Sequence, residues 1–302
     1  MSAAQSFGYH PSTMPTVLDD LVKLIALEKL EENLFRGQSQ DLGWGTVFGG
    51  QVLGQALSAA TQTVPADRGA HSLHAYFLRP GDVSKPIVYD VDRIRDGGSF
   101  TTRRVVAIQS GHAIFNMAVS FQKAEKSFEH QDTMPDVAPP ESVPTEQERI
   151  AAAGELLPKA FHDLFGKQQP FETRPIESID HPFSPKPMPA SRHVWLRTIA
   201  PLPDAQPIHN ALLAYASDHG FLATALFPHG ITFFGNAVQI ASLDHVMWFH
   251  APFRADQWLL HVMDSPIARA GRGLVRGRVF TQDGRLVAST AQEGMIRKRR
   301  AT

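Results

Sequence analysis

The sequence predicts an α+β protein built from two tandem units, each a buried helix followed by an antiparallel sheet that wraps it. Residues on the two sides of the chain resemble one another at a constant offset of 172 residues, without gaps over about 70 residues. Prolines concentrate between the two sides, since 11 of the 22 lie between residues 126 and 190. We therefore divide the chain into an N-terminal unit at 16–125, a connector at 126–190 and a C-terminal unit at 191–300.

The offset aligns short motifs and one candidate functional residue. Phe77-Leu-Arg-Pro80 aligns with Phe249-His-Ala-Pro252. Thr46, which precedes a helical run, aligns with Asp218, which is expected to precede one as well. Two units of this kind can pair their sheets edge to edge, which leaves a groove where each helix meets the other half.

Each unit is expected to contain the same elements in the same order. The helix of the first unit, Phe48–Ala60, is apolar nearly all round, so it should be buried, and its small residues let its backbone approach a sheet closely. Asp283-Gly284 favours a tight hairpin turn in the second unit. The extended segments are 87–94, 103–109 and 113–121 in the first unit and 258–263, 274–281 and 286–291 in the second.

The connector is expected to contain little regular structure. Proline fixes φ and lacks an N–H donor, so it disfavours helix interiors and central strands. One short helix is expected within it, around Thr145–Phe165.

Composition excludes several classes of function. The chain has 29 basic and 30 acidic residues, whereas proteins that bind nucleic acid or a membrane surface usually carry a strongly basic patch. It has no cysteine, which excludes disulfides, thiolate metal sites and a cysteine nucleophile. Met1–Pro15 lacks the basic-then-apolar order of a signal peptide, so a cytoplasmic protein is expected. The histidines form no compact metal-ligand pattern, so neither a metal nor a cofactor is expected.

Several segments, in the same order along the chain, carry a resemblance to a known family. They are Leu34-Phe-Arg-Gly37, Val47-Phe-Gly-Gly-Gln-Val52, His71–Gly81, Ser217-Asp218, Gln239–Pro252, Gly277–Gly284 and Leu286–Gly294. In these segments the chain resembles the type II acyl-CoA thioesterase (TesB-like) family. The resemblance runs from about Leu27 to Arg297 and is weakest across the connector.

The resemblance implies a double-hotdog fold, with two tandem hotdog domains, and hydrolysis of acyl-CoA to free fatty acid and CoA. It also implies a catalytic set of an aspartate, a hydroxyl residue and a glutamine, which falls on Asp218, Ser242 and Gln292. The middle residue is often threonine in the family and is serine here, so the hydroxyl is kept and a methyl group is lost. By analogy with such proteins, the chain is expected to be a homo-oligomer.

The chemistry of hydrolysis suits these three residue types. It requires a water molecule near the thioester carbonyl, a base for its proton, and donors for the developing oxyanion. Asp218 can accept the proton, Ser242 can bind the water, and the Gln292 amide can orient it. Backbone N–H groups at the start of the helix expected after Asp218 would polarise the thioester oxygen.

Each of the three also has a purely structural interpretation. Asp218 could be a helix N-cap, Ser242 a strand or turn residue, and Gln292 a solvent-facing strand residue. At the offset of 172 the three align with Thr46, Ala70 and Ser120, which include no carboxylate and no amide. One catalytic site per chain, in the C-terminal unit, is therefore predicted.

Two other classes of function remain open at this stage. A hotdog enoyl-CoA hydratase or dehydratase would need an acid–base pair such as Asp256 and His261, but the Asn-Pro element of those enzymes is missing between them. Asp244-His245 resembles a dyad, but adjacent strand residues point to opposite faces. A non-catalytic acyl-CoA-binding protein is the second alternative. Five arginines could bind CoA phosphates: Arg79, Arg103, Arg104, Arg272 and Arg276.

Overall fold

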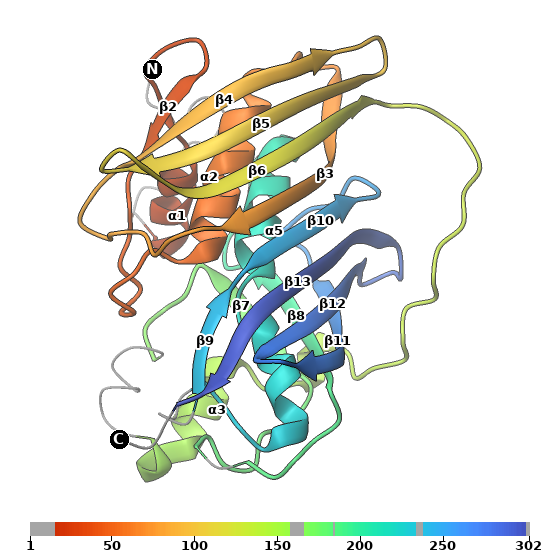
Figure 1. Ribbon diagram of the computed structural model, residues 1–302. Helices are drawn as coiled ribbons and strands as arrows, with labels where there is room; N and C mark the ends of the chain where they lie inside the picture. The colour runs from red at the N-terminus through yellow and green to blue at the C-terminus, as the bar shows by residue number, and fades with distance from the viewer. Residues whose placement is uncertain (1–15, 158–165, 184, 234–237, 300–302) are drawn as a thin grey trace.

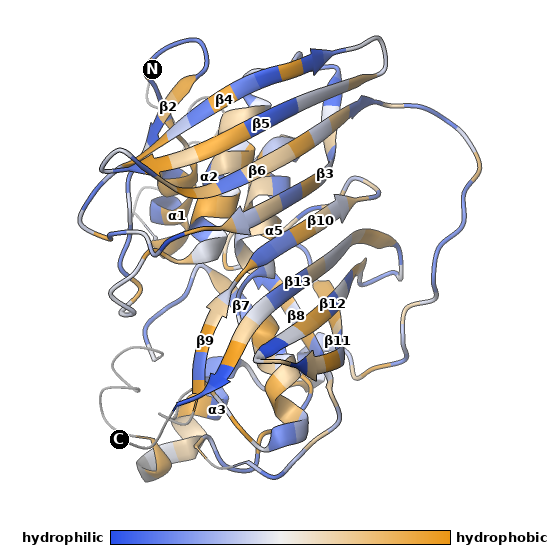
Figure 2. Cartoon of the chain, in the orientation of Figure 1, coloured by the Kyte–Doolittle hydropathy of each residue, from blue (hydrophilic) through white to orange (hydrophobic). Residues whose placement is uncertain are grey.

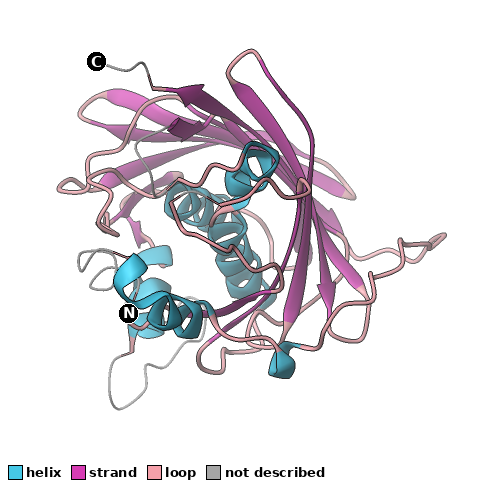
Figure 3. Ribbon diagram, turned by 90° about the horizontal axis from the view of Figure 1, so that it is seen from below, coloured by secondary structure: helices cyan, strands magenta, loops and turns pink. Residues whose placement is uncertain are grey.

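The computed structural model describes residues 16–157, 166–183, 185–233 and 238–299, in which one antiparallel sheet curves around the helices (Figures 1 and 3). The order of the strands is β1-β2-β4-β5-β6-β3-β10-β13-β12-β11-β8-β7, and β9 also pairs with β13. The strands are β1 (Glu28–Lys29), β2 (Leu34–Gly37), β3 (Arg68–Phe77), β4 (Ile87–Asp96), β5 (Phe100–Gln109), β6 (His112–Lys123), β7 (Phe171–Pro175), β8 (Ser191–Thr198), β9 (Val238–Ser242), β10 (Asp244–Phe249), β11 (Leu259–Arg269), β12 (Arg272–Thr281) and β13 (Leu286–Lys298).

The helices lie mainly on the concave side of the sheet, where α2 and α5 are neighbours (Figure 1). None of the described helices is long and apolar enough to cross a membrane. The α-helices are α1 (Val17–Ile25), α2 (Gly49–Thr61), α3 (Glu146–Ala153) and α5 (Gln206–Ser217), and the 3-10 helices are η2 (Pro140–Ser142), η3 (Gly154–Leu156) and η4 (Phe221–His229).

The two halves join edge to edge, as the sequence predicted. Strand β3 of the first half pairs with β10 of the second, with Leu73 opposite Met247. Along the strands, hydrophobic residues alternate with hydrophilic ones (Figure 2), because alternate side chains face the helices and the opposite surface. The main hydrophobic core extends from α1 through α2 and α5 to β10 and β12, so both halves share it.

Helices α2 and α5 approach each other at two glycines. A Cβ atom on Gly50 would lie 2.2 Å from the carbonyl oxygen of Tyr215, and one on Gly54 would lie 2.9 Å from that of Ala211. The helices are therefore antiparallel. The sequence predicted that small residues bring α2 close to the sheet, but these two glycines face α5 instead.

In the second half, η4 covers the sheet at two further glycines. A Cβ atom on Gly294 would lie 2.1 Å from a methyl carbon of Leu222, and one on Gly273 would lie 2.8 Å from Cβ of Ala225. Here η4 packs on β8, β11, β12 and β13 in a small hydrophobic cluster of its own. The first half contains no matching helix between α2 and β3.

The register of the sheet corrects the constant offset of 172 residues. That offset holds between β3–β5 and β10–β12, but β6 and β13 are offset by 173 because the second hairpin has one more residue. The helices differ more. The C-cap of α2 is Gln62 and that of α5 is Asp218, so the helices are offset by 156 residues. The second half contains 16 more residues between helix and sheet, which include η4.

The connector is more ordered than predicted. It contains α3, at the start of the expected helix Thr145–Phe165, whose residues 158–165 lie outside the described part of the chain. It also contributes β7, which pairs with β8 at the edge of the sheet. Figure 1 shows residues 124–139 passing from the first half to the second, where Trp195 Nε1 donates to the carbonyl of Ala138 at 2.9 Å. Met134 and Val137 pack on the outer face of the second half.

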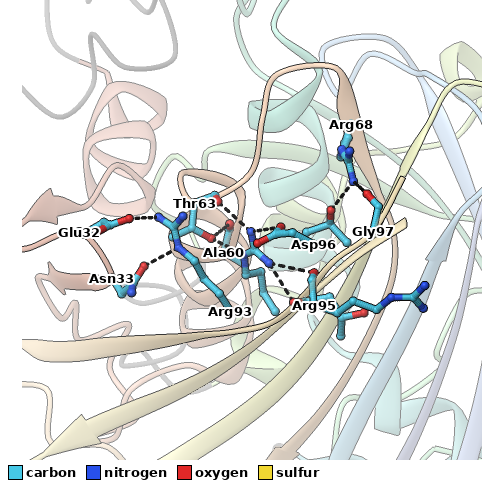
Figure 4. Close-up of polar contacts among 12 residues, drawn as sticks. Glu32, Asn33, Ala60, Thr63, Arg68, Arg93, Arg95, Asp96 and Gly97 are labelled. Carbon is cyan, nitrogen blue, oxygen red and sulfur yellow. Dashed lines mark hydrogen bonds and ion pairs between the residues drawn. The ribbon is translucent and has the colours of Figure 1, made fainter. Parts of the chain in front are cut away.

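A buried arginine ties Thr63, two residues after the end of α2, to the strands of the first half, and Figure 4 shows Thr63, Arg95 and Asp96 in this group of polar contacts. Arg103 is 0% exposed, and its guanidinium donates to Thr63 Oγ1 at 2.9 Å and to Asp96 Oδ1 at 2.6 Å. It also donates to the carbonyls of Thr63, Arg95 and Thr102. A buried charge is tolerated only when paired in this way. Arg103 is therefore structural and is not available to CoA.

Candidate active site

Asp218 lies at the end of a helix and not before one. It is the C-cap of α5, and Gly220 follows it with a φ of +65°, a value that suits glycine. The sequence predicted that Asp218 precedes a helix, because the 172-residue offset aligned Asp218 with Thr46 before α2, and it left an N-cap position as the structural alternative. That prediction is wrong, because the matching helix α5 precedes Asp218 and only the 3-10 helix η4 follows.

An extra residue between β9 and β10, where both pair with β13, orients Ser242. Between Ser242 in β9 and Val246 in β10, the register against β13 shifts by one residue. Such a bulge turns the strand locally, so side chains three residues apart face the same side. Ser242 and His245 both face the helices, and the carboxylate of Asp244 lies outside, where it accepts the backbone N–H of Glu293 at 2.6 Å.

The three residues that the sequence singled out are in mutual contact. Gln292 Nε2 donates to Asp218 Oδ1 at 2.9 Å and to Ser242 Oγ at 2.6 Å. Ser242 Oγ lies 3.4 Å from Asp218 Oδ1. They come from three separate elements: the end of α5, the end of β9, and β13. Asp218 and Ser242 are partly exposed, whereas Gln292 is only 1% exposed.

Gln292 is held at both ends by protein groups. Its oxygen Oε1 lies 2.9 Å from Nδ1 of His245, and its nitrogen contacts Asp218 and Ser242. We expected the amide to orient a water molecule directly. Instead, its geometry suits it to fixing the spacing between the Asp218 carboxylate and the Ser242 hydroxyl.

The start of α2 lies beside Asp218. A Cβ atom on Gly49 would be 2.6 Å from Asp218 Oδ2, which is the oxygen that Gln292 does not contact. The first N–H groups of a helix have no acceptor within the helix, and the helix start carries a partial positive charge. The helix start that reaches the carboxylate thus belongs to the first half, not to the segment after Asp218.

The first half has apolar side chains at the matching sheet positions. The strand register aligns Ser242 with Ala70. It also aligns Gln292, which lies opposite Val275 in β12, with Val119, which lies opposite Arg103 in β5. Val119 thus replaces Ser120 in the alignment, and Gln62 replaces Thr46 as the match to Asp218. The described first half has no carboxylate at these positions, as predicted, but Gln62 is an amide, which the prediction had excluded.

The alternative acid–base pairs do not form. Asp256 is paired with Arg254 at 2.7 Å and accepts the backbone N–H of Leu202, whereas His261 contacts Thr290 Oγ1 at 3.2 Å. Burial lowers the pKa of His261 to about 3. Asp244 and His245 face opposite sides of the sheet.

Other candidate ligand sites lie away from these residues. Among the described residues no group of three or more histidine, aspartate or glutamate side chains could hold a metal ion. A cavity of about 810 Å³ beside β7 and β8 is lined by Phe171, Arg197 and Arg254, but by none of the three candidate residues. The exposed candidate arginines Arg104, Arg272 and Arg276 form ion pairs with Asp92, Glu293 and Asp264, and Arg79 donates to the carbonyl of Ala113.

Known proteins resemble the chain over nearly its whole length. The acyl-CoA thioesterase family matches residues 161–295, and the acyl-CoA thioesterase N-terminal domain matches residues 39–122. Acyl-CoA thioesterase 2 of Haemophilus influenzae is 45% identical over 94% of this chain and 99% of its own. Human acyl-coenzyme A thioesterase 8 is 40% identical over 96% of this chain and 92% of its own.

A solved structure agrees with both the sequence and the fold. The acyl-CoA thioesterase II TesB2 of Mycobacterium marinum is 41% identical, covers 92% of this chain and 98% of its own, and superposes with a TM-score of 0.76. The double-hotdog fold is thereby confirmed. The chain belongs to the TesB-like acyl-CoA thioesterase family and is an enzyme that hydrolyses acyl-CoA thioesters.

Proposed function

We propose that the chain hydrolyses acyl-CoA to free fatty acid and CoA by direct attack of a water molecule activated by Asp218, Ser242 and Gln292. The supporting observation is the hydrogen bonding that joins these three side chains, 2.9 Å and 2.6 Å from the Gln292 amide. Polar residues from three separate elements meet there, and two of them are reachable by solvent.

Each group has a distinct part in the proposed reaction. Asp218 takes a proton from the water through Oδ2, and Ser242 holds the water through its hydroxyl. The water oxygen forms a bond to the thioester carbon, the carbon–sulfur bond then breaks, and the CoA thiolate takes up the proton. Gln292 keeps the carboxylate and the hydroxyl at a fixed spacing throughout.

The two units contribute different groups to this single site. The C-terminal unit, 191–300, supplies the base, the hydroxyl and the amide. The N-terminal unit, 16–125, supplies the start of α2, where the N–H groups of Gly49 and Gly50 stabilise the oxyanion. Because Ala70 and Val119 cannot activate water, we propose one site per chain.

Isotope labelling distinguishes direct attack from a covalent intermediate. We expect a single turnover in ¹⁸O-labelled water to place one ¹⁸O atom in the released acid and to leave the mass of the protein unchanged. If Asp218 itself attacked the thioester and water then opened the anhydride at Cγ of Asp218, the acid of the first turnover would carry no label and the protein would gain one ¹⁸O atom. An acylated peptide that contains Ser242, trapped by rapid acid quench and found by mass spectrometry, would also contradict the proposal.

Replacing Gly49 tests the proposed contact between α2 and the base. The Cβ atom of Gly49→Ala would press on Asp218 Oδ2 at 2.6 Å and on the ring of Phe77 at 2.9 Å. Both are ends of side chains, so the fold should survive and the carboxylate should move. We expect kcat to fall about 10-fold with little change in melting temperature, because small misplacements of catalytic groups are costly. Gly69→Ala, which meets no atom within 4 Å, is the control and should keep full activity.

Two broader predictions accompany this function. We propose that the chain acts in the cytoplasm and that it self-associates. Size-exclusion chromatography with light scattering would measure the second directly, and a monomer at micromolar concentration would contradict it.

A further inference from the structure

A buried histidine that the proposed reaction does not use lies directly behind Gln292. His245 is 0% exposed, and its Nδ1 lies 2.9 Å from Gln292 Oε1. Its other nitrogen, Nε2, lies 3.0 Å from the hydroxyl of Ser217, the last residue of α5. Ser217 is covalently bonded to Asp218, and Gln292 donates to Asp218. His245, Gln292, Asp218 and Ser217 therefore form a closed ring of contacts that includes the carboxylate.

The chemistry of the groups fixes the direction of these hydrogen bonds. A carboxylate only accepts, so the Gln292 atom that faces Asp218 must be the amide nitrogen. The amide oxygen then faces His245, and because this oxygen also only accepts, His245 Nδ1 must carry a proton. In a flipped amide, the oxygen would face the carboxylate at 2.9 Å, and the hydroxyl of Ser242 would lose its donor.

The other ring nitrogen is matched to Ser217. Burial lowers the pKa of His245, so the ring is neutral near pH 7 and Nε2 carries a lone pair. The Ser217 hydroxyl, 1% exposed, has one proton and two acceptors within reach, Nε2 of His245 at 3.0 Å and the carbonyl oxygen of Ala214 at 2.9 Å, and beside a neutral ring it donates to Nε2. A neutral ring with its proton on Nδ1 and an acceptor at Nε2 therefore suits both neighbours.

The first half shows that the fold does not need this histidine. In the matching strands, Leu73 is paired with Val119, at the positions that correspond to His245 and Gln292. Both are fully packed, at 0% and 1% exposed, beside the same kind of bulge. The hydrogen-bonded pair His245 and Gln292 is thus present only in the half that carries the Asp218 carboxylate.

We propose that His245, held by Ser217, is a positioning residue that locks the Gln292 amide in the one orientation in which it donates to both Asp218 and Ser242. The inference rests on the proposed function of these three residues. It predicts that loss of the Nδ1 donor frees the amide to flip, which misplaces the base and the hydroxyl without weakening substrate binding.

Three substitutions separate the two contacts of His245. His245→Leu removes both and reproduces the Leu73 packing of the first half. His245→Asn restores a donor near the Nδ1 position, and His245→Gln reaches only the Nε2 position next to Ser217. With the acyl-CoA that wild type hydrolyses fastest, we expect kcat to fall about 10- to 100-fold for Leu and Gln, with KM unchanged, and to recover largely for Asn. Equal kcat for Asn and Gln, or full activity of Leu, would overturn the inference.

A double variant shows whether the histidine acts through Gln292. In a Gln292→Ala background, His245→Leu should lower kcat no further, whereas a merely structural residue would add its own loss. If Gln292→Ala kept wild-type turnover, the proposed function itself would be contradicted. If Gln292→Ala were slow but His245→Leu fully active, the role of His245 alone would be contradicted. Long-range ¹H–¹⁵N spectra of the wild-type histidines supply a test without substitution, since a His245 ring protonated on Nε2 alone would overturn it.

Discussion

Asp218→Asn should lower kcat by about 100-fold or more and leave KM nearly unchanged, because asparagine keeps the shape of the side chain and removes the proposed base. The amide could still contact Gln292 and Ser242, so the loss would come from proton transfer and not from the fold. Release of CoA thiol, measured over a panel from short- to long-chain acyl-CoA esters, gives both constants.

Asp244→Asn is the matched control for that loss. Asp244 lies two residues after Ser242 but faces the other side of the sheet, where it accepts the N–H of Glu293. Its substitution should leave kcat within about twofold, since surface changes of this kind are mild. If the control lost activity and Asp218→Asn kept it, the base would have to be sought in the Asp244-His245 pair instead.

Gly50→Ala should lower the free energy of unfolding by about 3 kcal/mol, near the upper end for overpacking a core. The new Cβ atom would lie 2.2 Å from the carbonyl oxygen of Tyr215 and 2.5 Å from the ring of Phe48. Because Tyr215 contributes a backbone atom within α5, neither helix can yield without moving as a whole. The expected result is a clear drop in the urea midpoint, followed by circular dichroism.

Gly69→Ala again serves as the control, since its Cβ atom meets open space. An unchanged urea midpoint for Gly50→Ala would mean that α2 and α5 lie farther apart in solution. The comparison with Gly49→Ala is also informative. Gly49→Ala should lower turnover with little change in stability, whereas Gly50→Ala should lower the free energy of unfolding and, because it shifts the start of α2, turnover as well.

The sequence predicted the sheet better than it predicted the helices. Alternating segments and the Asp283-Gly284 turn depend on local spacing, which a single sequence shows directly. The position of α5 was missed because one offset was applied to both units, although η4 lengthens the second. Pro207 in its first turn, followed by the apolar run Ala211–Tyr215, was an available signal for that helix. Strand β7 had no comparable signal, since its pairing with β8 is a long-range contact.

The candidate site was predicted through family motifs more than through local pattern. Asp218, Ser242 and Gln292 lie up to 74 residues apart in the chain, so no local spacing brings them together. The bulge that turns Ser242 inward depends on its pairing with β13, and the role of Gly49 depends on the packing of two helices. His245 was discounted as half of a dyad with Asp244. The rule that neighbouring strand residues face opposite sides is correct and argues against a dyad. It could not reveal the contact between His245 and Gln292, which depends on the pairing of two distant strands.

The joining of the halves at β3 and β10 has an evolutionary consequence. The carboxylate belongs to one repeat and the glycine that borders it to the other, so a change in either repeat alters the surroundings of the same few atoms. Two copies joined in this way cannot diverge independently, because a substitution at the start of α2 in the first half acts on the carboxylate of the second.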